Sequence, residues 1–213
     1  GNLHQGHQAL FSRAPHNTIK VATIYVNPLQ FDRNDDYQNY PRSLQTDLEV
    51  CMQNNISLVY VPKGDISNEI MIEKSIDLPK FTRYLCGQKR EGHFLGVYKI
   101  VKYLFSIVNP DFACFGKKDF QQLLLIKYIA NTYFPGTNII DVDTVRDINN
   151  IALSSRLTRL SKESLSLTSK IYETLESIKS ELLKGTSFKK LKEESEDYLR
   201  ANDIHVEYLD LRS

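Results

Sequence analysis

The sequence contains few cysteines, and their spacing excludes two classes of small stabilised fold. The three cysteines are Cys51, Cys86 and Cys114, with no C-x-x-C pair among them. An odd number of widely spaced cysteines argues against a disulfide framework and against a structural zinc site. We therefore expect reduced and mostly buried thiols, and we assign no metal-ligating residue.

Long apolar runs and an excess of one charge are also lacking. No apolar stretch approaches the ~20 residues that span a bilayer, so we expect a soluble, cytoplasmic protein. With 27 basic and 26 acidic residues, charge gives no reason to expect nucleic acid or a membrane surface as a partner. A chain of 213 residues, 41% of them hydrophobic, suits one ordinary domain with a smaller appendage.

Strand-like and helix-like segments alternate through the first two-thirds of the chain. β-Branched or apolar runs predict strands at Ile19–Val26, Ile56–Pro62, Phe112–Gly116 and Asn138–Val145. Helical spacing predicts helices after Pro41, with Leu44, Leu48 and Cys51–Met52 on one side, at Val97–Val108 and at Phe120–Ala130. This order predicts an α/β fold with a doubly wound parallel sheet and helices on both faces.

The composition changes near residues 145–160, where we place a domain boundary. A helix is predicted to start at Ser161 and to stop at Gly185, and a charged helix is predicted at Phe188–Ala201. The alternation in His205–Leu211 predicts a strand. We therefore predict a Rossmann-like domain at residues 1–145 and a smaller C-terminal α+β lid domain at residues 146–213.

The first residues, "GNLHQGH", place His4 and His7 on either side of Gly6. In a doubly wound sheet, ligands bind where a strand end turns into a helix, and a glycine there lets the backbone approach phosphate. Two imidazoles on this turn could hydrogen-bond phosphate oxygens or carry positive charge toward them. The stretch is therefore a candidate nucleotide site, although four residues alone also fit an ordinary helix start.

Five further stretches give this motif its context. They are "VNPLQF" (26–31), "YPRSLQTDL" (40–48), "REGHFLGV" (90–97), "GKKDFQQL" (116–123) and "ALSSR" (152–156). In order and approximate spacing, together with "GNLHQGH", they resemble the pantothenate synthetase family, the pantoate–β-alanine ligases. The resemblance covers essentially the whole chain, and "GKKDFQQL" and "VNPLQF" are its most specific parts.

The resemblance implies an ATP-dependent ligase of the nucleotidyltransferase superfamily, which couples D-pantoate to β-alanine through a pantoyl adenylate and releases pyrophosphate and AMP. It implies catalytic roles for His4, His7, Lys118, Ser154, Ser155 and Arg156. It implies ATP contacts for Gly1, Asn2, Leu3, His4, Gln5, Gly6, His7, Gly116, Lys117, Lys118, Asp119, Val145, Leu153, Ser154, Ser155 and Arg156. His7 corresponds to the family's proton donor.

The resemblance also implies the binding of the two smaller substrates. Gln30 and Gln122 correspond to the glutamines that hold pantoate, and Gln30 also lies beside the β-alanine position. Amides suit a hydroxy acid, because they donate and accept without adding charge. Cations must offset the repulsion between a carboxylate and a triphosphate, and Lys118, Arg156 and Mg²⁺ can do so. The family further implies a homodimer.

Plainer interpretations remain open for single residues. The glutamines could be ordinary polar residues, Lys117–Asp119 a charged helix start, and Ser154–Ser155 a capping turn. Asn27 could serve the loop backbone, and His93 could support the pantoate pocket rather than contact substrate. At the level of function, the alternatives are a related nucleotidyltransferase and a non-catalytic nucleotide-binding descendant.

The chain departs from the family pattern at a few positions. Lys117 stands where the family has Glu, Asn150 where it has Gly, and Leu157 where it has Asn. Asn150 is a mild change, because Asn tolerates left-handed backbone. In the family, the loop that ends on His7 normally follows a buried strand. We therefore expect that the chain is truncated at both ends and that it is not an active enzyme unless the missing residues are present.

Overall fold

The computed structural model describes residues 1–63, 66 and 76–212, and the chain forms two compact units. The first unit comprises Gly1–Val145 with Leu153–Ser155, and the second comprises Arg146–Ala152 with Arg156–Ser213. In the part of the chain that the structure describes, no helix is long and apolar enough to cross a membrane. The three cysteines are free, and Cys51 is buried.

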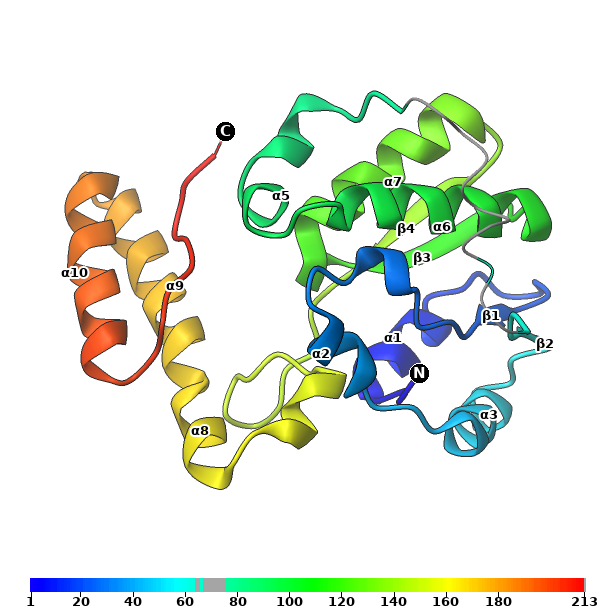
Figure 1. Ribbon diagram of the computed structural model, residues 1–213, viewed down its shortest axis with the longest axis horizontal. Helices are drawn as coiled ribbons and strands as arrows, with labels where there is room; N and C mark the ends of the chain where they lie inside the picture. Colours follow the sequence, from blue (N-terminus) through cyan, green and yellow to red (C-terminus); the bar gives the residue numbers. More distant parts are fainter. Residues whose placement is uncertain (64–65, 67–75, 213) are drawn as a thin grey trace. The chain divides into compact units, whose positions relative to one another are not determined.

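The strands of the first unit form parallel pairs (Figure 1). β1 (Val21–Thr23) pairs with β2 (Leu58–Tyr60), and β3 (Phe112–Gly116) pairs with β4 (Asn138–Val142). The register places Ala22 opposite Val59 and Cys114 opposite Ile140. All four predicted strands are therefore present, although three are shorter than predicted, because a strand extends only as far as its neighbour supplies hydrogen bonds.

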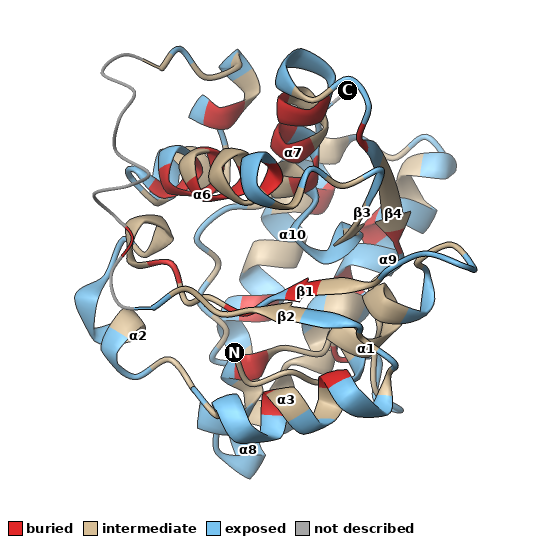
Figure 2. Ribbon diagram, turned by 90° about the vertical axis from the view of Figure 1, so that its right-hand side faces the viewer, coloured by how far each residue is buried: buried red, intermediate tan, exposed pale blue. Residues whose placement is uncertain are grey.

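Helices and 3₁₀ turns of the first unit connect and cover these strands. The α-helices are α1 (Gln5–Ser12), α2 (Asn34–Gln38), α3 (Leu44–Gln53), α5 (Cys86–Lys89), α6 (His93–Val108) and α7 (Phe120–Tyr133). The 3₁₀ turns are η1 (Pro28–Gln30), η2 (Lys80–Arg83) and η3 (Lys117–Asp119). Within this unit, α6 and α7 lie on one side of the strands and α1 and α3 on the other (Figure 2).

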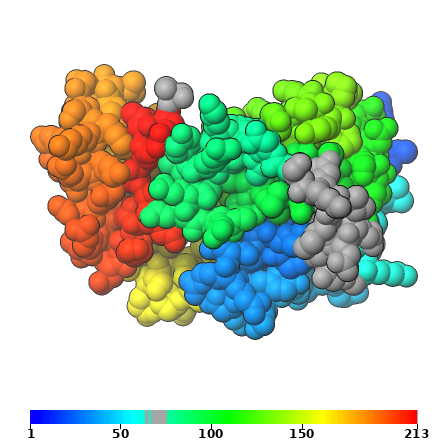
Figure 3. Space-filling view, turned by 45° about the horizontal axis from the view of Figure 1, so that its top comes forward, coloured from blue at the N-terminus to red at the C-terminus, as the bar shows by residue number. Residues whose placement is uncertain are grey.

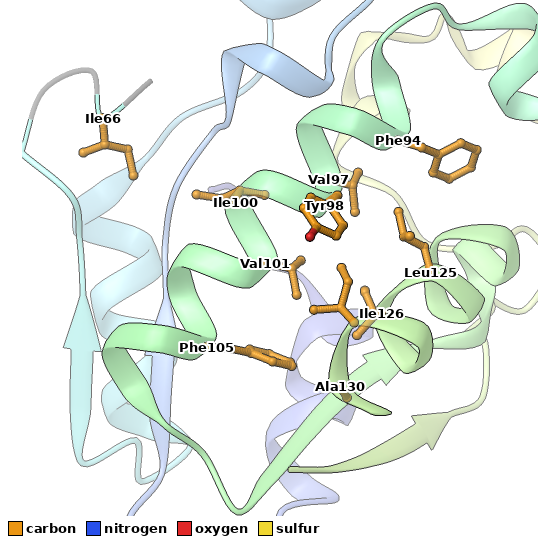
Figure 4. Close-up of a cluster of buried hydrophobic side chains, with 11 residues drawn as sticks. Ile66, Phe94, Val97, Tyr98, Ile100, Val101, Phe105, Leu125, Ile126 and Ala130 are labelled. Atoms are coloured by element: carbon orange, nitrogen blue, oxygen red, sulfur yellow. The ribbon is translucent and has the colours of Figure 1, made fainter. Parts of the chain in front are cut away.

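The main core forms between α6 and α7. Figure 4 shows Val97, Val101 and Phe105 of α6 directed toward Ile126 and Ala130 of α7. These side chains recur every three or four residues, which is the spacing that gives a helix one apolar face. Burial of this face stabilises the helix pair that carries the predicted site residues at its N-terminal ends.

The predicted apolar side of α3 is confirmed for Cys51 but is wrong for Leu44 and Met52. Leu44 and Met52 are 46% and 73% exposed, whereas Asp47 and Cys51, four residues apart on one face, are each 1% exposed. A carboxylate is rarely buried unless its oxygens are paired. The partners of Asp47 explain the difference, and they lie in the candidate site.

The described residues of the second unit form α-helices joined and flanked by irregular segments. The 3₁₀ turn η4 (Ser155–Arg159) begins at the last residue of the first unit and continues into the second. The helices are α8 (Lys162–Leu167), α9 (Ser169–Leu183) and α10 (Phe188–Ala201). Gly185 has a φ of 92° and ends α9 as predicted. The predicted strand at His205–Leu211 is wrong, because an alternating segment becomes a strand only where another strand pairs with it, and none does so among the described residues.

Candidate functional site

His4 and His7 together cap the N-terminus of α1. The Nδ1 atom of His4 accepts the Gly6 N–H at 3.1 Å, and the Nδ1 atom of His7 accepts the His4 N–H at 3.2 Å. This is a capping box in which histidines replace the usual Ser and Glu. The ring centroids lie 4.2 Å apart, so the motif "HQGH" fixes two imidazoles against each other at a helix start.

Gly6 is required by the close approach of the His4 ring. A Cβ atom at this position would lie 2.8 Å from Cε1 of His4, a separation that real Cβ atoms essentially never show. Any other residue at position 6 would displace the ring or open the turn. Gly6 therefore leaves room for the His4 ring, in addition to any space that it leaves for a ligand.

These hydrogen bonds also determine which ring nitrogen carries the proton. Since both Nδ1 atoms accept N–H groups, a neutral ring must carry its hydrogen on Nε2. Burial, with smaller contributions from His4 and Lys118, lowers the pKa of His7 to about 3. Burial and then Lys118 also lower the pKa of His4. At neutral pH the pair therefore offers two Nε2–H donors, which favours hydrogen bonding over the positive charge that the sequence left as an alternative.

The backbone before the histidines is held by Asp47. Its Oδ2 accepts the Asn2 N–H at 2.9 Å, and its Oδ1 accepts the Leu3 N–H at 2.6 Å. Asn2 has a φ of 57°, a left-handed conformation that Asn tolerates better than most residues. The buried carboxylate thus satisfies two backbone donors and fixes the path of the chain into His4.

Sequence reasoning assigned no role to Asp47, although "YPRSLQTDL" contains it. The available signal was its position four residues before Cys51, which places a carboxylate on the same helical face as a small buried residue. A buried acid in that position requires donors from elsewhere in the chain. The sequence shows the requirement but not the partner.

Ser155 approaches the same loop from the distant segment that follows Val145. Its Oγ donates to the Asn2 carbonyl at 3.0 Å, and its side chain is 4% exposed. The Leu153 N–H donates to the Val145 carbonyl at 3.0 Å. An ideal Cβ on Gly6 would lie 3.8 Å from Cβ of Leu153. Residues 153–155 therefore pack against the histidine loop within the first unit.

The turn after β3 brings two lysines to the strand ends, and they differ in their surroundings. The charge of Lys118 lowers the pKa of both His4 and His7, so this ammonium group lies near the imidazoles. Lys117 instead pairs with Asp143, directly after β4, at 2.7 Å between Nζ and Oδ1. The Lys117 that departs from the family pattern thus joins the two strand ends by an exposed ion pair.

Gln30 ends η1 and is held by its backbone carbonyl. The Nδ1 atom of His93 lies 2.7 Å from this oxygen, and Arg90 donates to it at 3.4 Å. A carbonyl only accepts, so Nδ1 of His93 carries the hydrogen. Burial lowers the pKa of His93, while the bond to Gln30 and the charge of Asp119 oppose that change. His93 thus supports the Gln30 turn, and Asp119 lies within electrostatic range of it.

Arg90 also ties two distant segments of the first unit together. Its Nε lies 3.1 Å from Oδ1 of Asp32, and both side chains are less than one-third exposed. In Figure 3 the green segment around residues 80–90 and the blue segment around residues 30–40 meet on the surface of this unit. The "REGHFLGV" and "VNPLQF" motifs are therefore neighbours in space.

The adjacent glutamines of "DFQQL" have different surroundings. The Gln121 side chain donates to the carbonyls of Phe81 and Tyr84, each at 2.8 Å, and accepts the Cys86 N–H at 3.2 Å. Gln122 is half-buried, and its side chain has no protein hydrogen bond within the described residues. Gln121 therefore stabilises the 81–86 segment, whereas the predicted binding of pantoate by Gln122 stays a prediction.

The first unit thus gathers most of the predicted site around one loop. Residues 1–7, 116–119, Val145 and 153–155 are linked by the contacts above, and Gln30 is linked through His93 to Asp119. Arg156 belongs to the second unit, so its role stays a prediction. Within the described residues, no group of three or more His, Cys, Asp or Glu side chains is arranged to hold a metal ion.

Comparison with known proteins finds similarity over the whole chain. The profile of the family described as "Pantoate-beta-alanine ligase" matches residues 1–213. Pantothenate synthetase of Aliivibrio fischeri is 39% identical, with all of this chain aligned to 74% of the relative. That of Shewanella woodyi is 37% identical, with all of this chain aligned to 77% of the relative.

Solved structures agree with the sequence relatives. Pantothenate synthetase from Thermus thermophilus superposes with a TM-score of 0.83 at 34% identity, covering 94% of this chain and 74% of that one. A pantoate–β-alanine ligase from Francisella tularensis, complexed with "Beta-gamma ATP" and β-alanine, gives a TM-score of 0.84 at 28% identity. It covers 100% of this chain and 79% of that one.

Proposed function

The chain belongs to the pantoate–β-alanine ligase family, and from this premise we propose that its first unit binds ATP and pantoate side by side and activates the pantoate carboxylate. The enzyme condenses pantoate with β-alanine at the expense of ATP. In the first step the carboxylate attacks the α-phosphorus, and pyrophosphate leaves. In the second step the β-alanine amine attacks the acyl carbon of pantoyl adenylate, and AMP leaves.

The ATP phosphates bind at the start of α1. Gly1–His7 form the loop, and the Nε2–H groups of His4 and His7 donate to phosphate oxygens. The start of α1 is also the positive end of the helix dipole, which favours negative phosphate. Negative phosphate beside the rings raises their pKa. Protonation of His7 then adds a hydrogen to Nδ1, which releases the His4 N–H, and Nε2 passes its own proton to the departing pyrophosphate.

Lys118 supplies the positive charge that the reaction needs. Carboxylate attack places additional negative charge on the phosphate oxygens in the transition state, and a fixed ammonium group stabilises that charge more than the ground state. Ser154 and Ser155 lie next to the phosphates, because residues 153–155 pack against the histidine loop. The family resemblance adds Arg156 to this group. Gly116, Lys117, Asp119, Val145 and Leu153 bind the nucleoside, with Asp119 accepting from the ribose hydroxyls.

Pantoate lies between Gln30 and Gln122. Within the described residues the side chain of Gln122 has no protein hydrogen bond, and His93 supports the turn of Gln30, which together favour this assignment. The electrostatic effect of Asp119 on His93 supports a position of the Gln30 turn near the nucleotide residues. A pantoate carboxylate held there would face the α-phosphorus, and β-alanine would enter beside Gln30.

Mg²⁺ fits this site as part of the substrate. Mg²⁺ is commonly bound through substrate phosphates and water with few protein ligands. The ion, when bound, offsets phosphate charge. The protein's own contribution is to hold the phosphates through His4, His7 and Lys118.

The proposed fold and assembly follow the same family. We take β1–β2 and β3–β4 as parts of one doubly wound sheet, with residues 146–213 as a lid domain, because helices occupy both sides of the strands in the first unit (Figure 2). The family resemblance supports a cytoplasmic homodimer. Light scattering at micromolar concentration tests the dimer, because a monomer mass would contradict it.

The observation that carries the proposal is the pair of fixed Nε2–H donors at the start of α1 beside Lys118. The test is exchange of radiolabelled pyrophosphate into ATP with pantoate present and β-alanine absent. Exchange that requires pantoate is expected, because adenylation is reversible before the amine arrives. Exchange without pantoate, or none with it, would contradict the adenylation step.

A further inference from the structure

Asn27 joins α6 to the side chain of Gln30. Asn27 is 2% exposed and caps η1, with its Oδ1 accepting the Leu29 N–H at 3.2 Å. Its Nδ2 donates to the Gly96 carbonyl at 3.0 Å and to Oε1 of Gln30 at 3.4 Å. The buried amide of Asn27 therefore uses its oxygen and both of its hydrogens in hydrogen bonds to the η1 turn and to α6.

The orientation of the Asn27 amide is fixed by its two backbone partners. A reversed amide would place NH₂ against the Leu29 N–H and oxygen against the Gly96 carbonyl, so both contacts would become repulsive. The second hydrogen on Nδ2 therefore has to face the Gln30 side chain. A partner of that hydrogen must be an acceptor, which selects Oε1 of Gln30 over Nε2.

The anchor of this arrangement is the backbone of α6. An ideal Cβ on Gly96 would lie 2.2 Å from the Leu29 carbonyl oxygen and 2.7 Å from the Gln30 N. Backbone atoms cannot move aside as a flexible side chain can, so only glycine permits this approach. The approach brings the Gly96 carbonyl within reach of Asn27, while His93 holds the carbonyl of Gln30.

We propose that Asn27 is a positioning residue that sets the direction of the Gln30 amide, so that Gln30 offers Nε2–H₂ to its substrate. The inference rests on the proposed binding of pantoate by Gln30. Gln30 then recognises an acceptor oxygen, such as an oxygen of the pantoate carboxylate, and not a hydroxyl that donates. Asn27 acts without touching the substrate.

A double-mutant cycle tests the coupling by calorimetry of pantoate binding at pH 8. Asn27→Asp keeps an acceptor for the Leu29 N–H but places oxygen against Gln30. We expect Asn27→Asp and Gln30→Ala each to weaken pantoate binding about tenfold. The double variant should bind as weakly as Gln30→Ala alone, because Asn27 has nothing left to orient. Asn131→Asp, an exposed change on α7, is the matched control and should bind like the parent.

The outcomes separate the two levels of the proposal. An unchanged affinity in Gln30→Ala contradicts the pantoate role itself. Losses that multiply in the double variant contradict the coupling and leave the pantoate role standing. ATP affinity, measured on the same samples, should not change, whereas a general disruption of the fold would lower it too.

If Asn27→Asp does not fold, Gln30→Glu tests whether Gln30 donates a hydrogen bond to pantoate or accepts one from it. Glu keeps an oxygen for Nδ2 of Asn27 and replaces the outward NH₂ by a second oxygen. We expect pantoate to bind Gln30→Glu more weakly than Gln30→Ala, because an acceptor then faces an acceptor. Binding as tight as or tighter than that of Gln30→Ala would mean that Gln30 accepts from the substrate, which overturns the inference.

Discussion

The Leu3 N–H donates to the buried Asp47 carboxylate across 2.6 Å, and this contact spans 44 residues of sequence. The other oxygen of Asp47 accepts the Asn2 N–H. The two bonds hold the loop whose last residue is His7. The position of both imidazoles therefore depends on a side chain from α3 that belongs to no catalytic motif.

Asp47→Asn should slow adenylate formation tenfold or more. The amide keeps one acceptor but turns NH₂ toward a backbone N–H, which leaves a buried donor unsatisfied at a cost of about 1–3 kcal/mol. Single-turnover pyrophosphate release measures the rate, and thermal unfolding measures the stability. Glu49→Gln, an exposed change on the same helix, is the control. A parent-like rate in Asp47→Asn would show that the loop does not need the carboxylate.

Lys118→Ala should lower the adenylation rate on the order of 10²-fold while changing ATP affinity much less. The reason is that the additional charge on the phosphate exists only in the transition state. Single-turnover rates and calorimetric ATP affinities distinguish the two effects, with exposed Lys80→Ala as the control for loss of a positive charge. A loss confined to KM would identify Lys118 as a uniform binding group.

The low pKa of His7 predicts a dependence of stability on pH. The folded pKa of about 3 lies below the ordinary histidine pKa of 6.5, so the unfolded chain binds more protons between these values. This contribution is therefore present above pH 6.5 and is lost as pH falls toward 3. Between pH 7 and 5 the free energy of unfolding should fall about 2 kcal/mol more in the parent than in His7→Gln.

His7→Gln is the suitable comparison because glutamine at this position can still accept the His4 N–H in a capping box. Carboxylates titrate in both proteins, so only the difference between the two curves reports on His7. Urea unfolding at a series of pH values provides the measurement. Parallel curves would mean that His7 is not held in its neutral form by burial.

The neighbouring glutamines should give opposite results. Gln122→Ala should weaken pantoate binding about tenfold with little change in Tm, since its side chain makes no protein hydrogen bond within the described residues. Gln121→Ala should lower Tm by several degrees, because Phe81, Tyr84 and Cys86 lose their hydrogen-bond partner. The reverse pattern would exchange the two assignments.

Local patterns predicted the elements well where a single segment carries the signal. The bounds of α10 (Phe188–Ala201) and β3 (Phe112–Gly116) agree with the prediction, and Gly185 stops α9. Apolar periodicity and left-handed glycine are properties of the segment itself. Residues 161–183, predicted as one helix, form α8 and α9 with Thr168 between them.

The failures concern features that need a partner far away in sequence. The 205–211 segment alternates but has no neighbouring strand among the described residues. Asp47 is buried because the backbone of residues 2 and 3 reaches it. Similarly, the direction of the Gln30 amide depends on the Gly96 carbonyl, 69 residues from Asn27. The motifs suggest which residues bind ligands but do not predict the contacts that hold those residues in position.

The most direct test of the central claim is the stoichiometry of the complete reaction. Purified protein is incubated with ATP, Mg²⁺, pantoate and β-alanine, and AMP and pantothenate are quantified together by chromatography. We predict equal amounts of the two products, and neither product when pantoate is omitted. AMP or nucleotide transfer without pantoate, or ATP binding with no pantothenate formed, would contradict the assignment of this site to pantoate activation.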